Sequence, residues 1–195
     1  MSTATPYARS GAPDGAYGAK PGDAFATAAY TDPLGAPLLA DLEREYDARY
    51  GTEVFGETAD VEINRYPAEA FAPPNGLFLL LLRDGEPISG GAYMRYDDAT
   101  AEVKRVWTRS DLRGRGLAGL VLTEIERRAE AAGYRRIYLT TGPRQPEAVR
   151  LYRRSGYTPL FDPALPAHEI GVHPFEKLLA PTAAVGAETA KEARP

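Results

Sequence analysis

The sequence contains no cysteine and few of the other residues that carry metal or nucleophilic chemistry. Its 195 residues include two histidines, two methionines and one tryptophan. Without cysteine the chain can form no disulfide framework, no thiolate metal site and no cysteine nucleophile. The isolated His168 and His173 have no metal-ligand spacing, and no Ser/His/Asp constellation can be assembled from local signatures. We therefore expect no bound metal.

Long apolar runs are also missing. The longest, residues 77–82, is far shorter than the roughly 20 residues that a membrane-spanning helix needs. The N-terminus has no basic segment that leads into an apolar one. These features predict a cytoplasmic protein without a membrane partner. The formal net charge of −4 argues against general binding of nucleic acid.

The overall composition, with 44% hydrophobic and 26% charged residues, is typical of a globular chain. The two ends differ from it, because 21 of the first 40 residues are Ala, Gly or Pro and the last residues are Ala-rich and polar. We predict an N-terminal extension over residues 1–31, one domain over 32–180 and a C-terminal tail over 181–195. Aromatic residues in the first segment leave open whether it is inert or packs against the domain.

Apolar periodicity within the predicted domain indicates alternating helices and strands. Every fourth residue is apolar or aromatic from Leu38 to Tyr50 and from Leu117 to Ala129, and each repeat ends at or near a glycine. Pro146 opens a third helix, which Gly156 closes. Strands are predicted over residues 77–82, 88–96, 101–108, 136–141, 157–160 and 171–177, of which the first three form an antiparallel meander.

A glycine-rich turn lies between the strand at 101–108 and the helix that starts near Leu117. Residues 114–119, Gly-Arg-Gly-Leu-Ala-Gly, match the dinucleotide pattern G-x-G-x-x-G. The next strand ends in Leu-Thr-Thr-Gly, with no carboxylate for a ribose, which disfavours a nicotinamide site. No Gly-Lys-Ser/Thr follows, which excludes a P-loop.

What the turn retains is the ability to bind an anion. Backbone N–H groups and the positive end of a helix dipole meet there, and Arg113 and Arg115 add guanidinium groups that suit phosphate oxygens. The turn therefore favours a diphosphate ligand. The alternative is an ordinary helix start with solvated arginines.

Two segments resemble the GNAT superfamily of acyl-CoA-dependent N-acyltransferases. Residues 101–118, AEVKRVWTRSDLRGRGLA, look like its core motif, in which Arg/Gln-x-x-Gly-x-Gly/Ala binds the pyrophosphate of coenzyme A. Arg113, Gly116 and Ala118 occupy these positions. Residues 145–157, QPEAVRLYRRSGY, resemble the later helix of the family, with its Ala-x-x-Leu-Tyr-x-x-x-Gly-Phe/Tyr pattern. The two motifs together, in the right order, are more specific than either alone.

The resemblance implies an α+β fold, with a mixed, mostly antiparallel sheet of six or seven strands that is splayed at its centre and flanked by helices. It implies acetyl-CoA as cosubstrate, with the pantetheine arm between the strands that end at Thr108 and Thr141 and a main-chain N–H near Val106 polarising the thioester. Gln145 stands where the family often has asparagine. The cosubstrate-binding residues that it implies are Val106, Trp107, Thr108, Arg113, Gly114, Arg115, Gly116, Leu117, Ala118 and Gln145.

The same resemblance implies direct transfer of an acetyl group to a primary amine. Tyr152 matches the family tyrosine that acts as general acid, and its alternative is a core aromatic residue. Glu102 resembles a strand glutamate that serves as base in some members, and its alternative is an ion pair with a nearby lysine or arginine. We expect a small-molecule acceptor. A peptide or protein acceptor, a non-catalytic acyl-CoA-binding module and a homodimer stay open as alternatives.

The charges are segregated along the chain. Residues 101–160 hold 13 of the 23 basic and 6 of the 27 acidic side chains, a local charge of +7, which leaves −11 for the rest. The basic block surrounds the turn predicted to receive a polyanionic coenzyme. The acidic remainder supplies most of the predicted acceptor side, which favours a cationic amine as substrate.

Overall fold

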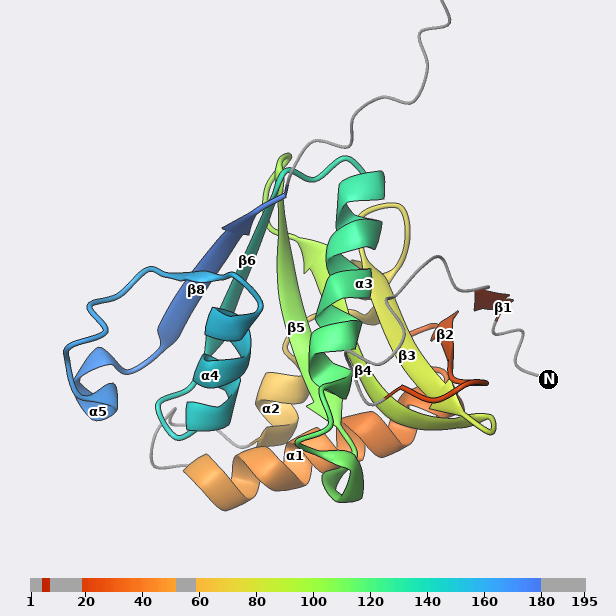
Figure 1. Cartoon of the computed structure of the whole chain (residues 1–195), viewed down its shortest axis with the longest axis horizontal. Coiled ribbons are helices and arrows are strands. Elements are labelled where there is room, and N and C mark those ends of the chain that lie inside the picture. Colours follow the sequence, from red (N-terminus) through yellow and green to blue (C-terminus); the bar gives the residue numbers. More distant parts are fainter. Residues whose placement is uncertain (1–4, 8–18, 52–58, 180–195) are drawn as a thin grey trace, which may run out of the picture.

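A computed structural model describes residues 5–7, 19–51 and 59–179 of the chain. Within these ranges one eight-stranded sheet has the strand order β1-β2-β3-β4-β5-β6-β8-β7, and helices cover both of its faces (Figure 1). The fold is therefore α+β with a mixed, mostly antiparallel sheet, as predicted. No helix in the described ranges is both long and apolar enough to cross a membrane.

Of the seven strand pairs in the described residues, six are antiparallel and one, between β5 and β6, is parallel. The six strands predicted from the sequence are all present, and β1 and β2 are additional. Their bounds are β1 Thr5–Tyr7, β2 Ala24–Thr27, β3 Leu77–Arg83, β4 Glu86–Arg95, β5 Thr100–Thr108, β6 Arg136–Thr141, β7 Thr158–Pro159 and β8 His173–Leu178.

The three predicted helices are also present, and two shorter ones lie between the elements. The α-helices are α1 Ala36–Tyr50, α2 Ala59–Asn64, α3 Leu117–Ala131, α4 Pro146–Arg154 and α5 Ala167–Ile170. Single 3-10 turns are η1 Pro33–Gly35, η2 Ala68–Phe71 and η3 Ser110–Leu112. Gly51 ends α1 and Gly133 follows α3, each with a positive φ, as the glycine positions predict.

Part of the segment predicted as an N-terminal extension belongs to the folded body. Strand β2 pairs antiparallel with β3 over four residues. Tyr30 is buried, and its ring stacks on Phe71 at a centroid distance of 4.5 Å. Asp23 forms an ion pair with Arg83 at 2.8 Å. Residues 23–30 thus continue the sheet and core, whereas the predicted C-terminal tail, residues 181–195, lies outside the described residues.

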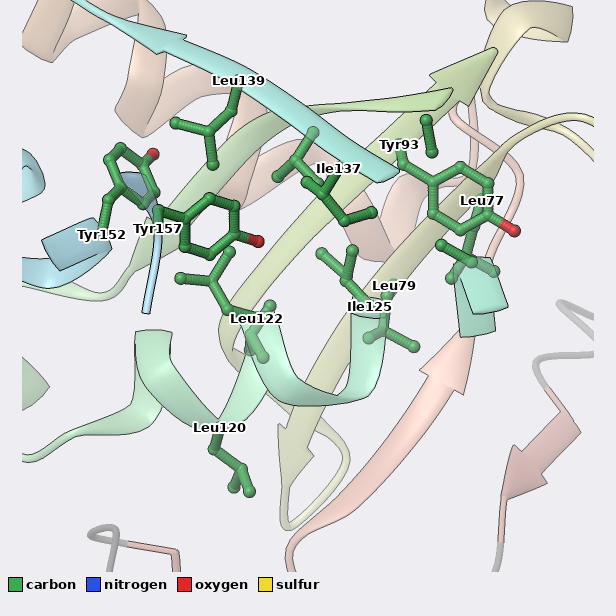
Figure 2. Packing of buried hydrophobic residues seen from close by; sticks show 14 of the residues in the cluster. Leu77, Leu79, Tyr93, Leu120, Leu122, Ile125, Ile137, Leu139, Tyr152 and Tyr157 are labelled. Atoms are coloured by element: carbon green, nitrogen blue, oxygen red, sulfur yellow. The ribbon is translucent and has the colours of Figure 1, made fainter. Parts of the chain in front are cut away.

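Two hydrophobic clusters lie on opposite faces of the sheet. One contains side chains of α3 and α4 with β3, β5, β6 and β8, and Figure 2 shows its centre, where Ile125 and Leu122 of α3 pack against Ile137 and Leu139 of β6. The other contains Leu38 and Leu42 of α1. The apolar stripes of α1 and α3 therefore fix these helices to the two faces of the sheet.

A bulge in β5 breaks the regular sheet next to the parallel strand pair. Gly90 of β4 faces Trp107 and Ala92 faces Lys104, so one residue of β4 opposes both Arg105 and Val106. Arg105 has a φ of 59°, which is uncommon for a residue other than glycine. On its other side β5 pairs with β6 only from Thr100 to Val103. The strands therefore separate after Val103, which confirms the predicted splay.

Candidate active site

A groove of about 400 Å³ runs between α1, the end of β5, the start of α3 and α4. It is lined by nine of the ten residues predicted to bind the cosubstrate, namely Val106, Trp107, Thr108, Arg113, Gly114, Gly116, Leu117, Ala118 and Gln145. The tenth, Arg115, is not part of the lining, and its guanidinium donates to the carbonyl oxygen of Asp111 at 3.3 Å. The fold thus brings the two sequence motifs together around one groove.

The glycine-rich turn gives this groove an anion-binding end. Gly114 and Gly116 have φ values of 74° and 80°, a region that favours glycine. Helix α3 starts directly after Gly116, and no side chain caps its first turn. The N–H groups of residues 117–119 therefore lack a helical acceptor and lie at the positive end of the helix dipole. This geometry fits the pyrophosphate of coenzyme A.

Arg113 crosses the groove to α1. Its Nη2 lies 2.7 Å from Glu45 Oε2, and its Nε donates to the carbonyl oxygen of Thr108 at 3.1 Å. Both Arg113 and Glu45 line the groove. The Arg113 guanidinium, which is predicted to bind phosphate, thus lies at the groove, where it forms an ion pair with the Glu45 carboxylate.

Tyr152 projects from α4 and is fixed by aromatic neighbours. Its ring lies 5.8 Å from that of Tyr157 and 5.6 Å from that of Phe175, and Figure 2 shows the two tyrosines side by side at one end of the cluster. Burial, with a smaller effect of Tyr46, raises the pKa of Tyr152 above its ordinary value. The hydroxyl therefore keeps its proton at neutral pH and is available as a donor.

A second cavity, of about 340 Å³, lies between α1, α2, β5 and the end of β6. It has both aromatic and charged walls. The tyrosines that line it are Tyr46, Tyr50, Tyr66 and Tyr152, and the charged residues are Glu62, Arg65, Lys104 and Arg105. None of these residues except Tyr152 is among the site residues predicted from the sequence.

The groove and the second cavity meet at a shared wall. Val106, Gln145, Ala148 and Tyr152 line both spaces. Gln145 is held there because its side-chain oxygen accepts hydrogen bonds from Thr141 Oγ1 at 2.7 Å and from the Gly142 N–H at 3.0 Å. A ligand that reached along the groove would therefore meet a second molecule beside the Val106 main chain and the Tyr152 ring.

The bulge holds Arg105 against α2. The guanidinium, 4% exposed, donates to the Tyr30 hydroxyl at 3.2 Å and to the carbonyl oxygens of Glu62 at 2.7 Å and Ile63 at 3.1 Å. These bonds offset the cost of a positive φ at a residue with a side chain, about 1–2 kcal/mol. Arg105 thus fixes both the bulge and the end of α2 that faces the second cavity.

The structure separates Glu102 from the shared wall. Its carboxylate is buried, 7% exposed, and pairs with Lys104 Nζ at 2.8 Å, and it lines neither cavity. The ion pair is the alternative interpretation of this residue. Neither histidine lines a cavity: His168 is exposed on α5, and His173, which pairs with Thr141, is buried with Nδ1 2.8 Å from the carbonyl oxygen of Gly171.

Most residues that the sequence reasoning missed come from the acceptor-side walls. Tyr46 and Tyr50 belong to the stripe that predicts α1, but a stripe shows only that its members face inward. Glu45 and Arg150 line the groove, and nothing in their sequence neighbourhood marks them. Trp107 has a second role in tying β5 to α1, since its indole N–H donates to Asp41 Oδ2 at 3.1 Å.

Comparisons with known proteins agree with this geometry. The family model described as "Acetyltransferase (GNAT) family" matches residues 38–157, which span α1 to the end of α4. The chain belongs to the GNAT acetyltransferase family. It is therefore an acyl-CoA-dependent N-acyltransferase, and the family assignment made from the two motifs is confirmed.

Several GNAT relatives can be compared individually. An uncharacterized N-acetyltransferase of Schizosaccharomyces pombe is 29% identical over 119 residues, which are 60% of this chain and 72% of that protein. An IAA acetyltransferase of Azospirillum brasilense is 33% identical over 101 residues, 47% of this chain and 66% of that protein. Both alignments agree with the family assignment.

Solved structures extend the likeness to most of the fold. A putative acyl-CoA N-acyltransferase from Klebsiella pneumoniae has a TM-score of 0.61 and 25% identity, and the alignment covers 81% of this chain and 98% of that one. A GNAT acetyltransferase from Elizabethkingia anophelis, crystallised with acetyl-CoA, has a TM-score of 0.55 and 15% identity over 82% of this chain and 100% of that one. The latter likeness shows the fold alone.

The described residues hold no group of three or more His, Asp or Glu side chains that could bind a metal ion. The groups on the shared wall are instead a main-chain segment, a phenol and an amide. They can polarise a carbonyl group and donate a proton.

Proposed function

We propose that this GNAT enzyme transfers the acetyl group of acetyl-CoA directly to a primary amine of a small molecule. The observation that carries the proposal is the shared wall, where the coenzyme groove and the second cavity meet at Val106 and Tyr152. Two substrates can be held there at once. Because the chain has no cysteine, no cysteinyl acyl-enzyme can form.

The groove supports binding of the cosubstrate at both of its ends. The start of α3 and Arg113 suit the pyrophosphate, as the charges and free N–H groups there predict. On the β4 side Arg105 and Val106 share one opposing residue in the bulge, and on the other side pairing with β6 has ended at Val103. The main chain at Val106 is therefore open to the amide groups of the pantetheine arm, and its N–H is positioned to stabilise a developing oxyanion.

The reaction then needs two proton movements and one group transfer. The neutral amine nitrogen bonds to the acetyl carbon, the bond from that carbon to sulfur breaks, and the Tyr152 hydroxyl gives its proton to the sulfur. The nitrogen loses its surplus proton, which passes through water to the Tyr152 phenolate and restores the hydroxyl. The raised pKa of Tyr152 suits a donor, because the hydroxyl is still protonated at the pH where amines are neutral.

The base is assigned less directly. Glu102 stays a prediction, and its ion pair with Lys104 weakens the case for it. Glu62 is the carboxylate that lines the acceptor cavity within the described ranges, and it forms an ion pair with Arg65 at 2.8 Å. The cations on this wall favour a neutral amine, so proton loss to water before attack is the simplest route.

The acceptor is proposed to be small because its cavity is small. A volume of about 340 Å³ is at the lower end of the range of about 300–1,000 Å³ for small-molecule sites. A peptide or protein acceptor is the alternative. Intact-mass measurement of products from a mixed panel of peptides and small amines separates the two. The cytoplasmic location and the homodimer remain predictions.

Cosubstrate binding is tested first. Coenzyme A at 100 times its dissociation constant should stabilise the protein by about 2.7 kcal/mol, which a thermal melt detects. No stabilisation at millimolar acetyl-CoA or coenzyme A contradicts the proposal at its first step. Binding without thiol release for any amine would instead favour a non-catalytic acyl-CoA-binding module.

The role of Tyr152 is tested by removing its hydroxyl. Tyr152→Phe should lower kcat by about 10²–10⁴-fold, the usual contribution of a positioned general acid, and leave the affinity for coenzyme A nearly unchanged. The matched control is Tyr157→Phe, which removes the hydroxyl of the neighbouring buried tyrosine outside both cavities. Equal rates in the two variants would exclude Tyr152 as the acid.

A further inference from the structure

The acceptor cavity has an unbalanced set of charges on its wall. Among the residues that the structure describes there, three are cationic, Arg65, Lys104 and Arg105, and one is anionic, Glu62. Glu102 lies behind Lys104 and contributes one more negative charge from outside the lining. The wall with this neighbour therefore carries one positive charge in excess.

One of the three cations, Lys104, has donors for an additional anion, and Arg65 adds positive charge beside it. Lys104 Nζ lies 2.8 Å from Glu102 Oε1 and 5.1 Å from the centre of the Tyr66 ring. An ammonium group has three donors, of which Glu102 takes one. Burial lowers the pKa of Lys104, but the hydrogen bond and charge of Glu102 outweigh it and raise that pKa overall, so the group stays charged. Arg65 is 42% exposed, and its Nε contacts Glu62 at 2.8 Å.

Arg105 has a different part, because its Nε and Nη2 donate to Tyr30 and the carbonyl oxygens of α2, and its Nη1 lies 3.5 Å from Glu62 Oε1. It adds positive potential to the cavity without offering itself as a ligand. A second cationic group brought in with the substrate would be repelled, whereas a single negative group would neutralise the excess.

We infer that the acceptor amine also carries a carboxylate, which Lys104 binds within the positive wall, so that the substrate class is a small amino acid or amino carboxylic acid. This inference rests on the proposed function, because it concerns the second substrate of the same reaction. It modifies the expectation of a cationic amine, which was based on the net charge of −11 outside residues 101–160.

The placement along β5 agrees with such a substrate. Lys104 stands two residues before Val106, and both line the acceptor cavity. Two residues of a regular strand span about 6–7 Å, and the bulge at Arg105 makes the distance between the carboxylate-binding position and the reacting position shorter than that. In an α- or β-amino acid one or two carbon atoms join the two groups, and with the reach of the lysine side chain both fit between these positions.

The same cations also assist the chemistry. A positive wall disfavours the protonated form of a bound amine and so lowers its pKa toward the working pH. A carboxylate held between the amine and Lys104 keeps the substrate bound despite this repulsion. A diamine or an aminoglycoside has no group that compensates for it.

The first test compares matched amines with and without a carboxylate. Acetyl transfer to phenylalanine and phenethylamine, and to β-alanine and propylamine, is followed by thiol release. We expect the acid of each pair to have a kcat/KM at least tenfold higher. Equal or better transfer to the carboxylate-free partners overturns the inference and leaves the proposed function intact. No transfer to any amine by a protein that binds coenzyme A overturns the proposed function itself.

Binding is measured separately from turnover. Calorimetric titration of phenylalanine into the protein saturated with coenzyme A, which has no acetyl group to transfer, should show binding that phenethylamine does not. Binding of phenethylamine alone contradicts the inference.

The second test removes the proposed anion-binding charge. Lys104→Met should raise the KM for the amino acid by about 10–100-fold, which corresponds to the loss of one hydrogen bond to a charged group. The KM for the carboxylate-free partner should not change comparably. Because this variant leaves Glu102 unpaired, the double variant Glu102→Gln/Lys104→Met is made beside it. Arg95→Met, which removes an exposed cation paired with Asp98 outside both cavities, is the matched control. An unchanged KM in the double variant refutes the inference.

Discussion

The ion pair between Glu45 and Arg113 sets up a competition that can be measured. Glu45 Oε2 lies 2.7 Å from Arg113 Nη2, and both side chains line the groove proposed for coenzyme A. A pyrophosphate that binds Arg113 must share the guanidinium with this carboxylate and must also approach a negative charge. We predict that Glu45→Gln, which keeps the shape of the side chain, strengthens coenzyme A binding.

The size of this effect follows from the exposure of the pair. The side chains of Arg113 and Glu45 are 45% and 20% exposed, so solvent screens their attraction and its worth is at most about 1 kcal/mol. Repulsion between the carboxylate and a phosphate is of similar size at such exposure. Together they amount to about 1–2 kcal/mol, or roughly 5–30-fold in the dissociation constant.

The assay is calorimetric titration with coenzyme A at low salt and again at 0.5 M NaCl. Screening at high salt should shrink the difference between the two proteins, because the Debye length falls to a few ångströms. The control is Glu43→Gln, which makes the same charge change on α1 at a residue outside both cavities. Weaker binding by the Glu45 variant would refute the reasoning, since it would mean that Glu45 holds Arg113 in the phosphate-binding position.

Two glycine positions give further predictions about the packing that shapes the site. A Cβ on Gly90 would lie 2.6 Å from Leu38 Cδ1 and 2.8 Å from a main-chain oxygen of β3. Gly90→Ala should therefore lower the free energy of unfolding, measured with denaturant, by about 1–3 kcal/mol. Gly91→Ala should cost less, because the atoms within 3.5 Å of its Cβ are all ends of side chains. A Cβ on Gly142 would lie 2.1 Å from the Tyr50 hydroxyl, so Gly142→Ala should raise the acceptor KM, and adding Tyr50→Leu should reverse part of the loss of thermal stability. Unaltered stability in both alanine variants would show that α1 can move away freely.

The core of the fold was predictable because its signals are local. The fourfold spacing from Leu117 to Ala129 predicts α3, and the structure confirms that helix over residues 117–131. The glycine-rich turn and the Leu-Tyr segment of α4 are each one continuous stretch of sequence. The local sequence of each stretch determines the backbone conformation that it has at the groove. Local sequence was sufficient there because the proposed ligand contacts are largely main-chain N–H groups of one turn.

The N-terminal strand was missed because its signal is not local. Residues 24–27, Ala-Phe-Ala-Thr, are too short and too small to stand out within a segment rich in Ala, Gly and Pro. Their place in the sheet depends on pairing with the edge of β3 that β4 leaves unpaired. It also depends on the ion pair between Asp23 and Arg83, which are 60 positions apart in the sequence. Pairing across such a separation leaves no periodic trace in either segment.

The charge of the acceptor cavity shows why an average over sequence can mislead. In a regular strand Lys104 and Arg105 would point to opposite faces of the sheet. The bulge turns Arg105 to the side of α2, where it bonds to Tyr30 and Ile63, so that two consecutive cations serve one cavity. The same bulge interrupts the regular pairing of Val106 with β4. One backbone irregularity, which cannot be read from the sequence, thus produces both the positive acceptor wall and the main-chain segment left open to the cosubstrate. Substrate charge preference and thioester binding are coupled through it.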